Sequence, residues 1–312
     1  MPADATAPGA QTSAGSQGLI EHGREELRRH VAAGWDAFLT AVESVDLESK
    51  SRLPGWRARE IAIHLGSWPD HRAMEGLQAS ARGEGPDSPV DPDAVNDAVT
   101  REHRNASRDD ILAALRRNRD EVLGYLDDDG CADLDRATVI STVGALPLLT
   151  VVHATVYELA VHALDLVSCG AAPPSEDVQL SGLAALADVT GALAASLDIT
   201  GGAVLSTPAG GWHFAAKGGG WTVTKTSTGE SHGRTPVVEA ALPTLLDASA
   251  GRENPVKLLT YRKLKVHHMG GLMRLAPIVE KQPGIPGGPV LRLAARTVGS
   301  AGGVVTRLTG RA

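Results

Sequence analysis

The spacing of apolar residues predicts helices in the first half of the chain. Apolar side chains recur with the 3.6-residue period of an α-helix between Leu19 and Val45. Pro54 and Gly55 interrupt this pattern, and a second helix is predicted from Ala58 to Arg82. A helix of that length would carry four polar or aromatic side chains along one stripe: His64, Trp68, His71 and Glu75.

Three further helical segments follow. The loop GEGPDSPVDPDAVND is rich in Gly, Pro and Asp, and it precedes a short helix predicted at Ala94 to Arg104. Ser107 is suited to cap a third long helix, which is predicted to continue to Leu126. Residues 133–144 are polar and irregular, and a fourth long helix is predicted from about Leu146. Long helices joined in this way favour a four-helix bundle.

The pattern changes after the sequence GAAPP at residues 170–174. Gly and Pro end the preceding helix, so we expect a domain boundary here. A helix is predicted over Val178 to Ala195, and the short runs AVLST, WHFAA and GWTVTKT after it indicate an antiparallel meander. The remaining predictions are a helix over Pro236 to Ala250, a strand-like run KLLTYRKLKVHH and a last helix over Gly271 to Glu280.

Together these elements predict an α + (α+β) fold. With 312 residues, the chain is longer than one hydrophobic core usually serves, so two domains are expected. The predicted parts are a disordered tail over residues 1–17, a helical bundle over 18–170, a smaller α+β domain with an antiparallel sheet over 175–282, and a flexible basic tail over 283–312.

Charge and composition exclude several classes of partner. A formal net charge of −7 argues against nucleic acid, because phosphate binding relies on concentrated Lys and Arg. No run of eighteen uninterrupted apolar residues occurs, and the N-terminus lacks the regions of a secretion signal. We therefore expect a cytoplasmic protein without membrane insertion. Cys131 and Cys169 are too few and too far apart for a disulfide framework or a cysteine-based zinc site.

The strongest chemical signal is a pair of ionisable residues in the apolar stretch VVHATVYELAVHALDLV, residues 151–167. Glu158 and His162 are four residues apart, so they lie side by side on a helix, and their apolar neighbours predict that both are buried. They could pair with each other. With His64 from the second helix, they could instead form a site of two nitrogens and one carboxylate oxygen with an open fourth position, which is typical of catalytic zinc.

Two segments of the chain resemble a known family. LPGWRAREIAIHLGSW, followed later by YELAVHALDL, is similar to the mycothiol-dependent maleylpyruvate isomerase family, within the DinB-like metal-binding helical bundles. The likeness covers most of residues 18–170. It implies a DinB-like four-helix bundle in which His64, Glu158 and His162 hold a divalent metal, usually zinc, and it implies mycothiol as the thiol cofactor.

The resemblance also implies a reaction. A divalent cation with an open position would stabilise the thiolate of mycothiol, which is a nucleophile. The expected activity is cis–trans isomerisation of a small electrophile or S-conjugation to it. Asp165, three residues after His162, is either a residue that orients a ligand or a surface acid at the helix end. His71 is a spare ligand candidate, with a bundle-edge role favoured, whereas Cys169 lies about 10.5 Å along the helix axis from His162 and is too distant.

The C-terminal segment resembles, less closely, the sterol carrier protein type two fold. The basis is LLDASAGR followed by a Leu-Lys-Val strand. Where that fold usually has an acidic residue after the strand, this chain has His267 and His268, and a structural or surface role is favoured for both because adjacent strand residues point to opposite faces.

Two other functions stay open. One is a non-catalytic, metal-containing protein that binds or carries a small molecule or lipid. The other is a bundle without metal, in which Glu158 pairs with His162 or with an arginine.

Overall fold

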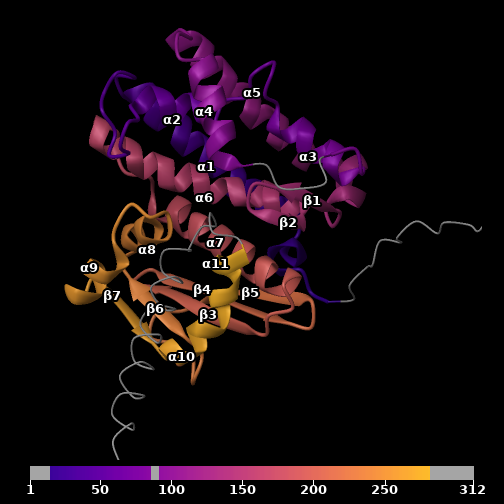
Figure 1. Cartoon of the computed structure of the whole chain (residues 1–312), viewed down its shortest axis with the longest axis vertical. Helices are drawn as coiled ribbons and strands as arrows, with labels where there is room; N and C mark the ends of the chain where they lie inside the picture. Colours follow the sequence, from indigo (N-terminus) through magenta and orange to yellow (C-terminus); the bar gives the residue numbers. More distant parts are fainter. Residues whose placement is uncertain (1–14, 86–90, 282–312) are drawn as a thin grey trace, which may run out of the picture.

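The computed structural model describes residues 15–85 and 91–281. These residues form a helical N-terminal region followed by a mixed α+β region, which confirms the predicted fold class (Figure 1). Most of the predicted N-terminal tail and all of the tail predicted over 283–312 lie outside the described residues.

The N-terminal region is built from helices and one small hairpin. Its helices are η1 (Gly18–His22), α1 (Arg24–Ser44), α2 (Ala58–His64), α3 (Ala73–Ala81), α4 (Pro92–Glu102), α5 (Arg108–Asp127), η2 (Asp129–Leu134), α6 (Leu148–Leu166) and η3 (Val167–Cys169). The hairpin consists of β1 (Thr138–Ser141) and β2 (Gly144–Pro147) and replaces the irregular segment predicted before α6.

The C-terminal region contains a five-stranded sheet. Its elements are α7 (Glu176–Ser196), β3 (Gly201–Thr207), β4 (Gly210–Lys217), β5 (Gly220–Thr226), β6 (Val237–Ala240), α8 (Leu242–Ser249), α9 (Pro255–Thr260), β7 (Leu264–His267), α10 (Met269–Leu272), η4 (Met273–Leu275) and α11 (Ala276–Lys281). The strand order is β5-β4-β3-β6-β7. The meander β3–β4–β5 is antiparallel as predicted, but β6 pairs in parallel with β3, so the sheet is mixed.

The predicted second helix is wrong beyond His64. The helix α2 ends there, and a loop leads to the separate helix α3. Pro69 explains the break, because proline lacks an N–H and disfavours the helical conformation of the residue before it. Trp68 and His71 instead exchange backbone hydrogen bonds of 3.1 and 3.0 Å across the loop, so the expected stripe of side chains does not form.

Two predictions in the C-terminal region are also corrected. The segment predicted as a helix from Pro236 is first the strand β6 and only then the helix α8, because Val237 and Val238 favour a strand and Pro243 lies in the first turn of α8. The strand-like run at residues 257–268 begins within helix α9 and becomes a strand only at Leu264.

The helix α7 lies between the helical region and the sheet (Figure 1). It packs on α6 and on β4 and β5, which explains why its sequence is apolar on nearly all sides. Two stretches, Leu148–Cys169 and Glu176–Ser196, are long and apolar enough to span a membrane, but their apolar windows are 72% and 94% buried inside the protein. Packing in the core therefore accounts for their hydropathy.

The close approach of α6 and α7 depends on Gly182. A Cβ atom at this position would lie 2.8 Å from the Cβ atom of Ala160, whereas a Cβ atom on Gly124 in α5 would meet nothing within 4 Å. We expect the free energy of unfolding of Gly182→Ala to be about 1–3 kcal/mol lower than that of Gly124→Ala, because that is the usual cost of overpacking. Urea unfolding of both variants measures the difference. Equal stability of the two variants would show that the helices can separate freely.

Candidate metal centre

The fold brings the three predicted ligands together. His64 is the last residue of α2, and Glu158 and His162 lie one turn apart on α6. One ligand atom from each of them lies within 4.8 Å of the others. The ring centroids of His64 and His162 are 5.4 Å apart, and His162 Nε2 is 3.5 Å from Glu158 Oε2.

The two residues on α6 differ in exposure. The side chain of His162 is 5% exposed, as expected, but that of Glu158 is 45% exposed, so the prediction that both are buried is wrong for the glutamate. The apolar pattern of α6 could not reveal this, because it does not show where the neighbouring helices end. The half-exposed carboxylate leaves the cluster open to solvent on one side.

Asp165 contacts the ring of His162. Its Oδ2 atom is 3.0 Å from His162 Nδ1, and its side chain has no solvent exposure. The expectation of a surface acid is therefore wrong, and Asp165 is a buried partner of a predicted ligand. When Nδ1–H donates to this carboxylate and Nε2 has lost its proton, the Nε2 lone pair, which lies on the side of Glu158, would be able to bind a cation.

Two arginines surround Asp165. Arg52, in the loop before α2, donates from Nε to Asp165 Oδ1 at 2.6 Å, and Arg252, just after α8, donates from Nη2 to Oδ2 at 3.0 Å. Arg52 also donates from Nη1 and Nη2 to Asp247 of α8, at 2.8 and 2.6 Å. Sequence reasoning missed Arg52, Asp247 and Arg252. The sequence offered one signal for them, which is that they lie next to or within the family-like segments. Arg52 immediately precedes LPGW, and the other two lie within LLDASAGR.

The surroundings also set the protonation of the cluster. Burial lowers the pKa of His64 to about 4, so this imidazole is neutral at pH 7 and keeps a lone pair for coordination. Burial acts to lower the pKa of His162 too, but hydrogen bonds with Asp165 and Glu158 outweigh it and raise the pKa. The surrounding protein dehydrates Glu158 and acts to raise its pKa, but the hydrogen bond with His162 and the charges of His162, His64 and Arg252 together outweigh this effect and lower the pKa.

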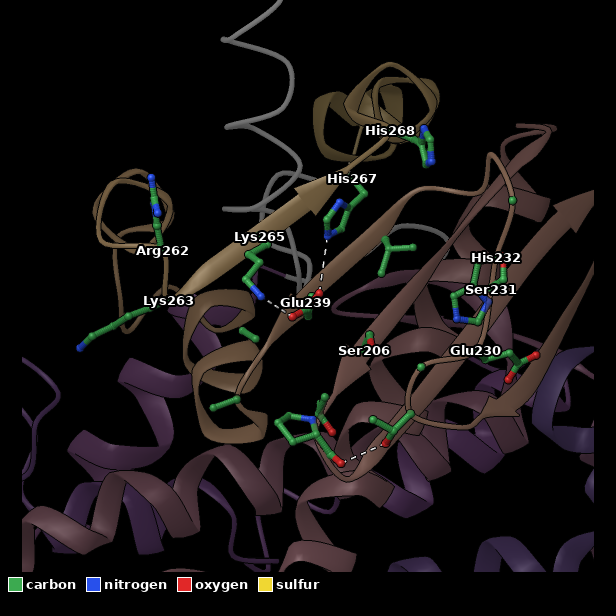
Figure 2. Close-up of a pocket in the computed structure, with 18 residues that line it drawn as sticks. Ser206, Glu230, Ser231, His232, Glu239, Arg262, Lys263, Lys265, His267 and His268 are labelled. Atoms are coloured by element: carbon green, nitrogen blue, oxygen red, sulfur yellow. Dashed lines mark hydrogen bonds and ion pairs between the residues drawn. The ribbon is translucent and has the colours of Figure 1, made fainter.

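Other sequence candidates lie apart from this cluster. The Sγ atom of Cys169 contacts the backbone oxygens of Ser49 and Lys50, and burial raises the pKa of its thiol, which opposes a reactive role. His71 is not a member of the group of converging ligand atoms. His267 Nε2 is 3.5 Å from Glu239 Oε2. Both residues line an open hollow of about 720 Å³, which His268 also lines. Figure 2 shows His267 turned toward Glu239.

The donor set fits a catalytic metal. Two imidazoles and one carboxylate converge. The imidazole of His162 also contacts the carboxylate of Asp165, and one side of the cluster is open. Zinc sites in enzymes commonly have three such protein ligands and leave a further position for water or substrate. The arrangement is therefore a candidate site for a divalent cation.

The chain is similar to a known protein family and to solved structures. Residues 28–167 match the family model described as "Mycothiol maleylpyruvate isomerase N-terminal domain". A crystal structure of the mycothiol-dependent maleylpyruvate isomerase is similar, with a TM-score of 0.52, 18% identity, and coverage of 81% of this chain and 96% of that chain. A histidine-to-alanine mutant of that enzyme gives a TM-score of 0.50, 16% identity and the same coverages.

The likeness to these crystal structures spans both regions of the fold. No curated protein sequence matches the chain. The family match runs from the second turn of α1 to the end of α6, and it includes all three converging residues. Residues 28–167 of the chain are therefore similar to the mycothiol maleylpyruvate isomerase N-terminal domain family.

Proposed function

We propose that this chain is a metal-dependent, mycothiol-using enzyme that acts on a small electrophile, either by cis–trans isomerisation or by S-conjugation. The observation that carries the proposal is the convergence of His64, Glu158 and His162 within the family's domain, with ligand atoms inside 4.8 Å. A bound divalent cation, probed first as zinc, would supply the positive charge that stabilises the mycothiol thiolate at neutral pH.

The protein's own residues have separate roles in this proposal. His64, Glu158 and His162 would hold the cation, and Asp165 keeps the His162 ring in one orientation. The side of the cluster next to the exposed part of Glu158 gives a thiol and a substrate access from solvent. Asp165 itself is enclosed by Arg52 and Arg252, so its carboxylate is committed to the protein and does not compete for the cation.

A carrier function is less well supported. An apolar pocket lies between α7 and the sheet, lined by side chains that include Leu183, Phe214, Val238 and Leu275. Its volume is about 50 Å³. Pockets for drug-sized ligands measure about 300–1,000 Å³. A lipid in this pocket would therefore require the sheet and α7 to separate.

Metal analysis of the purified protein tests the proposal. We expect about one divalent ion per chain in the wild type and strong loss of metal in His64→Ala and Glu158→Ala, because a catalytic zinc site has about three protein ligands. His71→Ala is the matched control, because His71 lies outside the converging group, and it should keep its metal. Equal metal content in all variants would remove the assigned ligands and favour a Glu158–His162 ion pair without metal.

Turnover then separates enzyme from carrier. The proposed enzyme should convert an electrophile such as maleylpyruvate only when both mycothiol and metal are present, and chelation followed by zinc addition should remove and restore the rate. A tightly bound lipid without turnover would instead support the carrier function.

A further inference from the structure

We propose that Asp247 of α8 is a positioning residue for the metal centre, acting on His162 through Arg52 and Asp165. This inference rests on the proposed function, because it concerns the geometry of one of the assigned metal ligands. It gives the α+β region a definite role, in which α8 would help to set how tightly the helical region holds the cation.

A continuous chain of short contacts leads from α8 to His162. Asp247 accepts hydrogen bonds from Nη1 and Nη2 of Arg52 at 2.8 and 2.6 Å. The Nε atom of the same guanidinium donates to Asp165 Oδ1 at 2.6 Å, and Asp165 Oδ2 is 3.0 Å from His162 Nδ1. Both carboxylates are buried, with Asp165 at 0% and Asp247 at 8% exposure.

The rigidity of arginine makes this chain of contacts effective. A guanidinium is planar and holds its N–H donors in a fixed fork, so two donors engaged by Asp247 determine the plane and the direction of the third. Arg52 is anchored by its backbone in the loop before α2, whereas Asp247 belongs to α8 and Asp165 to α6. The position of α8 is therefore transmitted to the carboxylate that orients His162.

The balance of charge around Asp165 also depends on Asp247. Asp165 accepts from both Arg52 and Arg252, so without a second carboxylate it would face two buried or half-buried cations alone. Asp247 neutralises one of them. When asparagine replaces this carboxylate, Arg52 loses its ion pair and one of the two acceptor oxygens. Its side chain, which is 30% exposed, can then turn toward solvent and release one side of Asp165.

The test compares Asp247→Asn with Asp135→Asn. Asp135 is a matched control because it is 7% exposed and accepts from Arg24 in a forked pair at 2.9 and 3.1 Å, but it does not contact Asp165. Cobalt(II) titration of the full chain, stripped of metal, gives both the affinity and a visible spectrum that reports ligand geometry. Partners of metal ligands typically contribute about 10–100-fold in affinity, so we expect about a tenfold loss in Asp247→Asn together with a changed spectrum.

Arg52→Lys is the second variant, in case Asp247→Asn fails to fold. It keeps the charge but loses the fork, and we expect the same weakening of cobalt binding with the same spectral change. Unchanged affinity and spectrum in Asp247→Asn, or equal weakening in Asp135→Asn, would overturn the positioning role. If His64→Ala and Glu158→Ala bind cobalt as tightly as the wild type, the assigned ligand set has failed, and that result is distinct from a failure of Asp247 alone.

Discussion

Asp165→Ala is expected to destabilise the folded chain by about 3–5 kcal/mol, which is the usual cost of removing one partner from a buried ion pair. The side chain of Asp165 has no exposure, and it binds Arg52, Arg252 and the ring of His162. Alanine would leave these donors without their shared acceptor in a partly dehydrated site. Urea unfolding, followed by far-ultraviolet circular dichroism with a chelator present, measures the loss without a contribution from bound metal.

A surface pair provides the comparison for this variant. Asp127 binds Arg28, but its side chain is 51% exposed. Because exposed ion pairs contribute about 0–1 kcal/mol, Asp127→Ala should lie within that range. A loss in Asp165→Ala no larger than in Asp127→Ala would mean that water replaces the lost carboxylate and that the network around His162 is not buried in solution.

The second large effect is a pH dependence of stability that depends on Asp188 of α7. This side chain has 0% exposure, and its Oδ1 accepts from the backbone N–H of Leu19 and from Trp221 Nε1 at 2.9 and 2.8 Å. Burial raises its pKa to about 6 from the usual 3.8, although these hydrogen bonds and the nearby His22 and Thr150 act to lower it.

The direction of the effect follows from proton binding. Between about pH 4 and pH 6 the folded state holds more protons on Asp188 than the unfolded state does, so stability falls as the pH rises through this window. A shift of about two pKa units corresponds to about 3 kcal/mol. Relative to Asp188→Asn, the wild type should therefore lose about that much unfolding free energy between pH 4 and pH 7.

Asp188→Asn is a suitable reference because asparagine keeps an oxygen acceptor for Leu19 and Trp221 but has no charge. Titrating groups that do not act on Asp188, such as the buried His153 and the half-buried His30, remain in both proteins and cancel in the difference. Urea unfolding of both proteins at several pH values checks the result. A constant difference across the range would falsify the assignment of a raised pKa to Asp188.

Local sequence signals predicted those parts of the fold that depend on neighbouring residues. The periodic apolar positions predicted α1 and α6, and Ser107 was identified as the N-cap of α5, where its Oγ accepts from the N–H of Asp110 at 3.1 Å. The same signals were wrong where a single residue changes the local conformation, as Pro69 does after α2. Periodicity extends a helix through such a position, because it counts side-chain faces and not backbone hydrogen bonds.

For the candidate ligands too, local sequence signals predicted one part of the site and the tertiary structure determined the rest. The spacing of Glu158 and His162 by itself places both on one face of a helix. The expected zinc donor set suggested His64 as a third ligand, and the resemblance to a family supported it. Only the tertiary structure determined that His64 lies against them, that Glu158 is half exposed, and that Arg52, Asp247 and Arg252 converge on Asp165. These contacts join residues far apart in the chain, so their distances depend on how α6, α8 and the loop before α2 pack together, and no local pattern in the sequence encodes that packing.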